Sequence, residues 1–332
     1  MQLSKMKLNI PKKSLEVLKN KKNLLAFSGG VDSSALFFIL LSNHIDFDIA
    51  TVNYNTRENS KLEAEYAKAL AKEFQKEIFL KETSLPSSNF EHTARKIRYD
   101  FFEKIIKEKH YDNLITAHQL DDKLEWFLMQ FAKGAGLSEI LGLNEITTKE
   151  DHTLVRPLLE YTKEELLEYL KQNGIKYFID ESNQDERYKR NRFRKAFSAP
   201  LLKEYKEGIK KSFEYLEKDK ELISCENEIK NIEDLYIFTK CENDLQNIRV
   251  IDKILKKLGY ILSKAQRDEI IQKKDVVISD SFSVVMQDDK IFISPYTKIK
   301  MPKSFKESCR IKKIPPKIRG YLYEKKIDLL SL

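Results

Sequence analysis

Short apolar runs alternate with longer stretches of helical length through the first half of the chain. The apolar runs cover 24–27, 47–52, 77–80 and 114–117, and the helical stretches open at 35–41 and continue over 60–74, 90–108 and 121–131. This alternation predicts a parallel sheet with helices on both faces. Ligands of such sheets bind at the carboxyl ends of the strands, where Ser28, Asn53 and His118 fall.

The chain changes character near 200–206. An irregular strand-like stretch at 144–159 and a helix at 162–172 come before this point. Charged helices and a few short strands come after it, with helices at 201–225, 250–258 and 263–273 and strands at 276–278, 283–286 and 291–293. We therefore predict an α/β domain over 1–203 and a smaller, mainly helical domain with a few short strands over 204–332.

Composition narrows the class of protein. The length of 332 residues allows two domains that each bury a core. The longest apolar run, 35–41, is too short to span a membrane, and the N-terminus lacks the apolar region of a signal peptide, so we expect a cytoplasmic protein without a membrane partner. Cys225, Cys241 and Cys309 are odd in number and widely spaced, which predicts neither a disulfide framework nor a zinc site.

Positive charge is concentrated in two places. The formal net charge is +8, and the segment 298–332 alone carries eleven Lys or Arg against three acidic residues. The segment 187–195 has six basic residues and no acid. Aromatic residues lie within both segments, which favours a nucleic-acid partner over a merely solvated surface, although either segment alone would be typical of a solvated helix face.

The turn at Ser28-Gly29-Gly30 joins the first apolar run to a helix. Paired glycines let the backbone approach an anion, and the helix N-terminus adds unpaired N–H groups, so we predict a phosphate site. The turn matches neither GxxxxGK[ST] nor GxGxxG. Asp32 would repel a phosphate unless a divalent cation such as Mg²⁺ joined the two. The alternative is an ordinary turn with Asp32 as a helix cap.

Three carboxylates and a histidine share one face of a predicted helix. His118, Asp121, Asp122 and Glu125 are spaced i, i+3, i+4 and i+7. Acids in a first helical turn, with Asp121 as the cap, would explain two of them. Glu125 and His118 are not explained in this way. The whole face therefore indicates a site for magnesium, a general base or an ammonium substrate.

The string SGGVDSS at 28–34 resembles the signature of the PP-loop ATP pyrophosphatase superfamily. The resemblance implies an adenine nucleotide alpha hydrolase-like fold, ATP as cofactor and adenylation of a substrate with release of pyrophosphate. It also implies nucleotide binding by Ala26, Ser28, Gly29, Gly30, Val31, Asp32 and Ser33. Because synthetases of small molecules and tRNA-modifying enzymes share this loop, it does not by itself give the substrate.

Further motifs resemble the tRNA(Ile)-lysidine synthetase family in the family's order over 24–195. They are Ala94-Arg95-x-x-Arg98-Tyr99, His118-x-x-Asp121-Asp122-x-x-Glu125, Arg156-Pro157-Leu158-Leu159, and Asp180-Glu181-Ser182-Asn183 followed by Arg190-Asn191-Arg192-Phe193-Arg194. The chain departs at Trp126, where the family usually has Thr, and at Tyr54-Asn55-Thr56-Arg57, where a His-Gly-Leu-Arg-like string is usual. The likeness is thinner beyond 201, and the length implies a shortened tRNA-binding C-terminal region.

This resemblance implies a ligase. ATP would adenylate the wobble cytidine in the CAU anticodon of tRNA(Ile), and the ε-amine of free L-lysine would then displace AMP. Catalytic roles fall on Asp32, Arg95, Arg98, His118, Asp122 and Glu125, and Mg²⁺ would be held by Asp32 and Asp122. Lysine would be bound by Asp121, Asp122 and Glu125, and tRNA by Lys189, Arg190, Asn191, Arg192 and Arg194. The division of roles among the carboxylates is left open, as is a homodimer.

Three other functions compete with this one. A PP-loop tRNA thiolase would need cysteines near the ATP site, and the chain has none before Cys225. A small-molecule amide synthetase would leave the basic segments without a role. An inactive RNA-binding protein on this scaffold would not require the intact loop and acidic face.

Overall fold

The computed structural model describes residues 6–54, 59–84, 90–179, 189–223 and 228–331. The chain forms two compact units, Met1–Glu217 and Lys218–Leu332, and each is considered by itself below. Along the described stretches, no helix combines the length and apolarity needed to cross a lipid bilayer.

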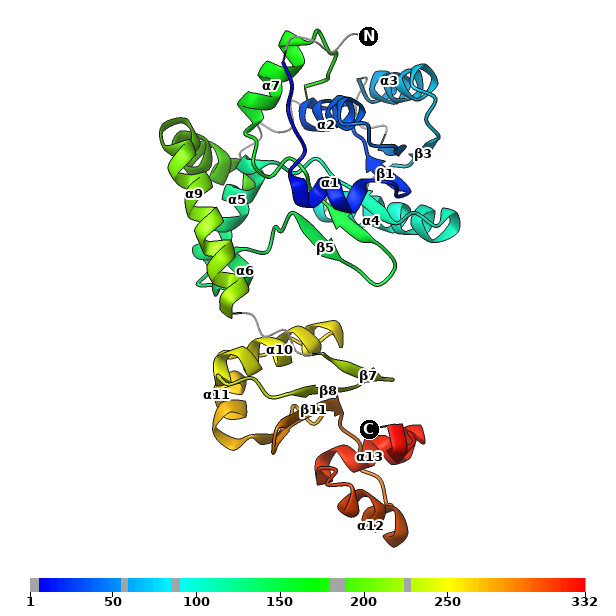
Figure 1. Ribbon diagram of the computed structural model, residues 1–332, viewed down its shortest axis with the longest axis vertical. Helices are drawn as coiled ribbons and strands as arrows, with labels where there is room; N and C mark the ends of the chain where they lie inside the picture. Colours follow the sequence, from blue (N-terminus) through cyan, green and yellow to red (C-terminus); the bar gives the residue numbers. More distant parts are fainter. Residues whose placement is uncertain (1–5, 55–58, 85–89, 180–188, 224–227, 332) are drawn as a thin grey trace. The chain divides into compact units, whose positions relative to one another are not determined.

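The first unit is built on a six-stranded sheet in the order β3-β2-β1-β4-β6-β5 (Figure 1). Its strands are β1 (Asn23–Ala26), β2 (Asp48–Asn53), β3 (Ile78–Glu82), β4 (Asn113–Ile115), β5 (Ile146–Thr148) and β6 (Thr153–Val155). All neighbouring pairs are parallel except β5 and β6, which form an antiparallel edge. The predicted parallel sheet is confirmed, and the irregular stretch at 144–159 supplies its antiparallel edge.

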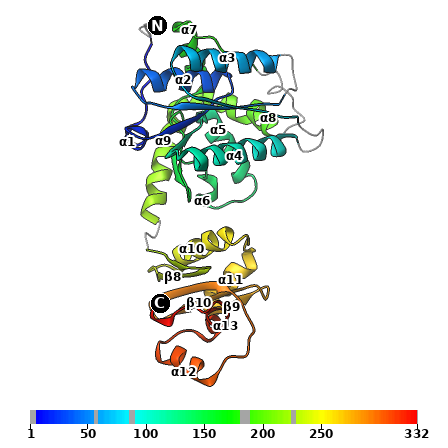
Figure 2. The same cartoon turned by 90° about the vertical axis from the view of Figure 1, so that its right-hand side faces the viewer.

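Helices cover both faces of this sheet. They are α1 (Lys12–Leu18), α2 (Val31–Ser42), α3 (Asn59–Glu73), α4 (Phe90–Lys109), α5 (Leu120–Phe131), α6 (Leu137–Ile140) and α7 (Lys163–Gln172). Alternate strand residues point to opposite faces: Leu25 packs in a core with α2, α3 and α7, and Leu24 packs in another with α4. Figure 2 shows α2 and α3 on one side of the sheet and α4 on the other.

One nearly continuous helical segment follows and packs against α5. It consists of α8 (Lys189–Phe193), the π-helical turn η2 (Arg194–Ser198) and α9 (Ala199–Ile223). Leu202 and Phe213 of α9 share a buried core with Leu120 and Leu124 of α5. The expected domain boundary at 203/204 therefore falls inside a helix whose first part belongs to the first unit, and the two units divide at Glu217 instead.

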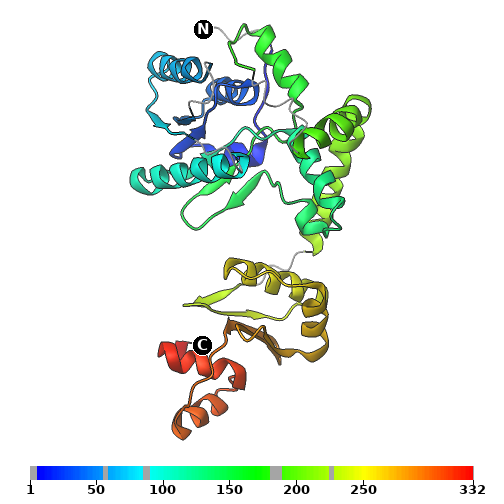
Figure 3. The same cartoon turned by 180° about the vertical axis from the view of Figure 1, so that it is seen from behind.

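The second unit is a sheet covered by helices on both faces, as Figure 3 shows from behind. The antiparallel order is β7-β8-β11-β10-β9, and the elements are β7 (Lys230–Ile232), β8 (Leu235–Thr239), α10 (Asp244–Lys257), α11 (Lys264–Lys273), β9 (Asp275–Ile278), β10 (Phe282–Gln287), β11 (Lys290–Pro295), α12 (Lys303–Ile311), α13 (Pro316–Lys325) and η3 (Leu329–Ser331). One face packs on α10 and α11 and the other on α12 and α13. Strands β7 and β8 were not predicted.

The cysteines correct one expectation. Cys241 is disulfide-bonded, whereas Cys309 is free and buried in α12. The count and spacing of the cysteines predicted no disulfide framework. An odd number still allows one pair, and folding can bring together positions that lie apart in the sequence. Cys225 lies outside the described residues.

Candidate functional site

The loop between β1 and α2 is shaped by a glycine and two serines. Gly29 has φ +75°, a left-handed conformation that glycine adopts without strain. The Ser33 hydroxyl lies 3.2 Å from the backbone nitrogen of Ser28, which donates to it, and 3.0 Å from the Ser28 hydroxyl. Gly30 occupies the N-cap position of α2 without a side-chain cap. The alternative in which Asp32 caps this helix is therefore wrong, and the amides of the first turn stay open to an anion.

Asp32 lies in the first turn of α2, and one of its carboxylate oxygens is buried. Within the described residues, its Oδ1 atom has no hydrogen-bond partner. Burial and the nearby carboxylates of Asp122 and Asp121 raise the pKa of Asp32 to about 7, although the charges of Lys163 and Arg194 oppose the shift. A buried carboxylate with a raised pKa and no partner among the described residues would be stabilised by a bound cation. Asp32 is therefore suited to bind one.

The acidic helix α5 begins at a glutamine. The Gln119 side chain accepts from the backbone nitrogen of Asp121 at 2.5 Å, and Asp122 Oδ2 accepts from the Gln119 nitrogen at 3.1 Å. This capping box makes Gln119 the N-cap of α5. The expectation that Asp121 caps this helix is therefore wrong. Asp121 Oδ2 accepts from the backbone nitrogen of Lys163 at 3.0 Å, and burial raises the pKa of Asp121.

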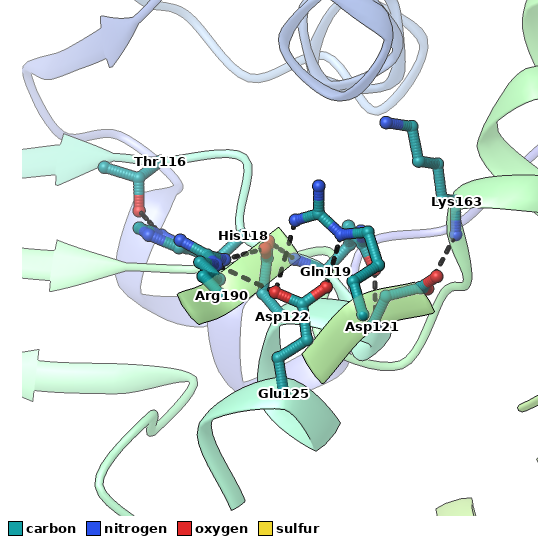
Figure 4. A network of polar contacts seen from close by, with 9 residues as sticks. Thr116, His118, Gln119, Asp121, Asp122, Glu125, Lys163 and Arg190 are labelled. Atoms are coloured by element: carbon teal, nitrogen blue, oxygen red, sulfur yellow. Dashed lines mark hydrogen bonds and ion pairs between the residues drawn. The ribbon is translucent and has the colours of Figure 1, made fainter. Parts of the chain in front are cut away.

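Two arginines contact the acidic face of α5 (Figure 4). Arg190 donates from Nε to Glu125 at 2.8 Å and also forms an ion pair with Asp122. Arg194 donates to Glu125 from Nε and, at 3.2 Å, from Nη2. Glu125 is only 1% exposed. Arg190 and Arg194 are four residues apart and so lie on one helical face, and Asp122 and Glu125 are three apart and so lie on one face of α5. The basic face can therefore contact the acidic face.

His118 lies beside these groups at the end of β4. Its Nδ1 atom is 2.9 Å from the Thr116 hydroxyl. Burial, assisted by the charges of Arg156, Arg190 and Arg95, lowers the pKa of His118 to about 4 despite the opposing effect of Asp122. The imidazole is therefore neutral at physiological pH and can both donate and accept a hydrogen bond.

The arginines of α4 act on groups in or near this region, because the charge of Arg95 acts on His118 and that of Arg98 acts on Tyr54. Arg95 lies over the ring of Tyr99, with 4.7 Å between the guanidinium carbon and the ring centroid. Tyr54 donates from its hydroxyl to the backbone oxygen of Ala94 at 2.7 Å. Among the described side chains, neither Arg95 nor Arg98 forms an ion pair with Glu103, and the side chain of Glu91 is not described. The alternative role of these arginines is surface ion pairing with Glu91 or Glu103, and the described side chains test only the pairing with Glu103, which is absent there.

The structure brings together most of the predicted site residues and leaves others undescribed. The nucleotide loop and the acidic face lie at the same edge of the sheet, where β1 and β4 end. Arg192 is exposed, unlike the two arginines that flank it. The side chain of Lys189 and the residues Asp180, Glu181, Ser182 and Asn183 lie outside the description.

Sequence reasoning gave no site role to three residues of this region, although it singled out the motif that begins at Arg156. Thr116 and Lys163 contact His118 and Asp121, and Arg156 is buried with its Nε atom unpaired within the described residues. Lys163 follows the capping threonine of α7, and Thr116 lies two residues before His118. Their positions next to recognised motifs were the only features of the sequence that could have indicated a role in the site.

Comparison with known proteins agrees with both resemblances seen in the sequence, to PP-loop proteins and to the tRNA(Ile)-lysidine synthetase family. The family of PP-loop domains matches residues 3–201. The tRNA(Ile)-lysidine synthase of Campylobacter jejuni (strain RM1221) is 47% identical over 96% of this chain and 97% of its own length. That of Wolinella succinogenes is 45% identical over 95% of this chain and 97% of its own length. Among solved structures, the U34-tRNA thiolase NcsA from Methanococcus maripaludis with its 4Fe-4S cluster aligns with a TM-score of 0.53 and 22% identity, covering 65% of this chain and 78% of that chain, which shows a common fold.

Proposed function

Because the chain belongs to the tRNA(Ile)-lysidine synthase family of PP-loop proteins, we propose that it uses ATP to join L-lysine to the wobble cytidine of the CAU anticodon in tRNA(Ile). The cytidine 2-oxo group attacks the α-phosphate of ATP, and pyrophosphate leaves. The ε-amine of lysine then attacks the adenylated carbon. The C–O bond to the adenylate breaks, and AMP leaves with its electron pair. The observation that carries the proposal is the acidic face of α5 at the edge that also holds the nucleotide loop.

The residues of the loop suit ATP and a divalent cation. The residues that we propose to contact ATP are Ala26, Ser28, Gly29, Gly30, Val31, Asp32 and Ser33. The unpaired Oδ1 of Asp32 fits Mg²⁺, which commonly takes one or two carboxylates and completes its shell with phosphate and water. Asp122 could contribute if its contact with Arg190 were exchanged. When bound, Mg²⁺ would neutralise charge on the phosphates.

The carboxylates of α5 suit the amine substrate. Free lysine has a side-chain pKa of about 10.4, so its amine must lose a proton before it attacks. Asp122 and Glu125 already hold two guanidinium groups, which supports the proposal that this face binds a cationic group. We propose that they, with Asp121, hold the ammonium group of lysine. We propose that His118, which is neutral because burial lowers its pKa, accepts a hydrogen bond from the substrates or donates one to them.

The remaining arginines suit anions. Arg95 and Arg98 would neutralise charge on the phosphates during adenylation. We propose that Arg190, Arg192 and Arg194, with Lys189 and Asn191, contact tRNA. For Arg190 and Arg194 this requires an exchange in which phosphates of the tRNA replace Glu125 and Asp122 as their partners, and the exchange would free the carboxylates for lysine.

Replacing Arg190 and Arg194 by Ala should test this exchange. We expect weaker tRNA binding and a shallower dependence of log Kd on log salt concentration, by roughly 0.7–0.9 for each tRNA phosphate that the variant no longer neutralises. The matched control is Lys203→Ala, which removes an exposed charge from α9. An unchanged salt slope in a folded double variant would mean that the arginines serve only to hold α8 on α5.

The assay for the function itself uses radiolabelled lysine, ATP and a tRNA(Ile) transcript with a CAU anticodon. We expect label on the tRNA that depends on ATP and on the cytidine at the wobble position. A thiolase would instead require a sulfur donor, and the chain has no cysteine before Cys225 to carry sulfur at the loop. Sulfur in the product, or no lysine transfer with active tRNA, would refute lysidine formation. We also propose that the enzyme acts in the cytoplasm, where its tRNA substrate is found.

A further inference from the structure

We propose that Lys163 is a phosphate-binding residue of the nucleotide site, and that its ammonium group contacts the triphosphate of ATP and the departing pyrophosphate. This inference rests on the proposed use of ATP. The segment 26–34 contains no Lys or Arg, so the glycine turn itself has no cationic side chain. Lys163 would supply this positive charge.

The fold places Lys163 beside the loop although 130 residues separate it from Ser33 in the sequence. Helices α2 and α7 pack against each other, and their last turns meet where Tyr169 lies near Ser42. At the opposite end, Leu120 donates from its backbone nitrogen to Tyr161 at 2.8 Å. This bond places the start of α7 beside the start of α5, and the charge of Lys163, which acts on Asp32, places its side chain near the first turn of α2.

The backbone of Lys163 is held, while its side-chain ammonium has no partner among the residues that the structure describes. Asp121 accepts from the Lys163 backbone nitrogen at 3.0 Å. Across the parts of the chain that are described, no hydrogen bond or ion pair involves the ammonium group, and Figure 4 shows the side chain extending away from that contact. Lys206 and Lys210 in the same region both contact Glu165, at 3.0 and 3.4 Å.

Two further features indicate a role in binding an anion. A lysine at the first position of a helix opposes the positive end of the helix dipole, which is an unfavourable local choice unless it serves another purpose. The charge of Lys163 also acts on Asp32, because it is one of the two charges that oppose the rise in the pKa of that carboxyl. The ammonium group is therefore close enough to the loop to act on a ligand there.

The chemistry of adenylation requires positive charge at this place. When the α-phosphate is transferred, the bond to the bridging oxygen breaks and the electron pair leaves on pyrophosphate. A lysine acts on such a group as a flexible point charge. Lys163 would stabilise the developing charge from the protein side, in addition to the backbone amides of α2.

The test compares Lys163→Gln with Lys171→Gln, which removes an exposed lysine from the last turn of the same helix. Pyrophosphate release with ATP and tRNA should show kcat/KM reduced roughly 10- to 100-fold for Lys163→Gln, as expected when a charge-assisted hydrogen bond is removed. Lys163→Arg should recover part of this activity, and Lys171→Gln should match the wild type.

A second measurement requires neither tRNA nor lysine. Inorganic tripolyphosphate should bind the wild type and Lys171→Gln equally, and Lys163→Gln roughly 10-fold more weakly, in a direct titration of folded protein. Equal binding and equal kcat/KM in Lys163→Gln would overturn the assignment. If the wild type itself released no pyrophosphate, the proposed adenylation would fail, whereas the tripolyphosphate titration would still decide the role of Lys163.

Discussion

Glu125→Gln is expected to abolish lysine transfer to tRNA, with a reduction of at least about 100-fold. Such a loss is typical when a positioned carboxylate is removed from a reacting proton or ammonium group. The change keeps the volume of the side chain and removes only its charge. Glu125 is buried and accepts hydrogen bonds from both Arg190 and Arg194. If it binds the ammonium of lysine once these arginines leave, the amide cannot replace it.

The same variant should also lower the free energy of unfolding. Removing one partner leaves two guanidinium groups beside an amide, which we expect to cost about 1–3 kcal/mol. The cost is moderated because the side chains of Arg190 and Arg194 remain 34% and 24% exposed. Urea unfolding measures this change, and Glu204→Gln, on the exposed surface of α9, is the matched control.

Two activities separate catalysis from support of the fold. Pyrophosphate release reports adenylation, and incorporation of labelled lysine reports transfer. A role in binding lysine predicts that Glu125→Gln at a temperature where it is folded loses transfer more strongly than adenylation. Near-normal lysine incorporation by the folded variant would show that Glu125 only holds α8 and η2 against α5.

The sequence was sufficient to predict the edge of the sheet at which the site lies. Ser28 and His118 follow apolar runs directly, and residues that follow parallel strands meet at one edge. The face of α5 could be predicted for the same reason, because the spacing from His118 to Glu125 has the helical period. Both predictions rest on residues that are close together in the sequence. The secondary structure that such residues form is retained in the folded protein.

The contact of Arg190 and Arg194 with that face could not be predicted. A basic run in a sequence has the same appearance whether it meets solvent, RNA or a buried acid, and 65 residues separate Arg190 from Glu125. Strand β7 and its turn were missed for a related reason: Glu233 adopts φ +56° where a glycine or asparagine would have signalled the turn. Partners distant in sequence and turns made by unusual residues require the structure.

Asp32→Asn is expected to reduce pyrophosphate release by at least about 100-fold and yet to stabilise the protein above pH 7. Activity is lost because an amide has no charge with which to hold a cation beside the phosphates. Stability rises because the ionised form of Asp32 destabilises the fold: its carboxyl is buried beside other acids, and its pKa is about 7 in the folded protein against 3.8 for an ordinary aspartate.

The direction of the pH dependence follows from these two values. Between pH 3.8 and about 7 the folded protein binds more protons at Asp32 than the unfolded chain does, so the free energy of unfolding falls as the pH rises through this window. Asparagine resembles the protonated acid at every pH. The variant should therefore match the wild type at low pH and exceed it above pH 7, by on the order of 1–4 kcal/mol.

Thermal unfolding of wild type and variant at pH 5 and pH 8, without nucleotide, measures this difference. Asp100→Asn on the exposed side of α4 is the control, because its surface pair with Lys96 contributes little. Affinity for ATP with Mg²⁺ should increase from pH 6 to pH 8 in the wild type, as Asp32 ionises, and should lack this increase in Asp32→Asn. Equal stability of the two proteins at pH 8, together with unchanged pyrophosphate release, would mean that Asp32 is neither strained by burial nor used at the nucleotide site. A gain in stability joined to a loss of adenylation would identify the unpaired carboxylate as a group kept for catalysis at the expense of the fold.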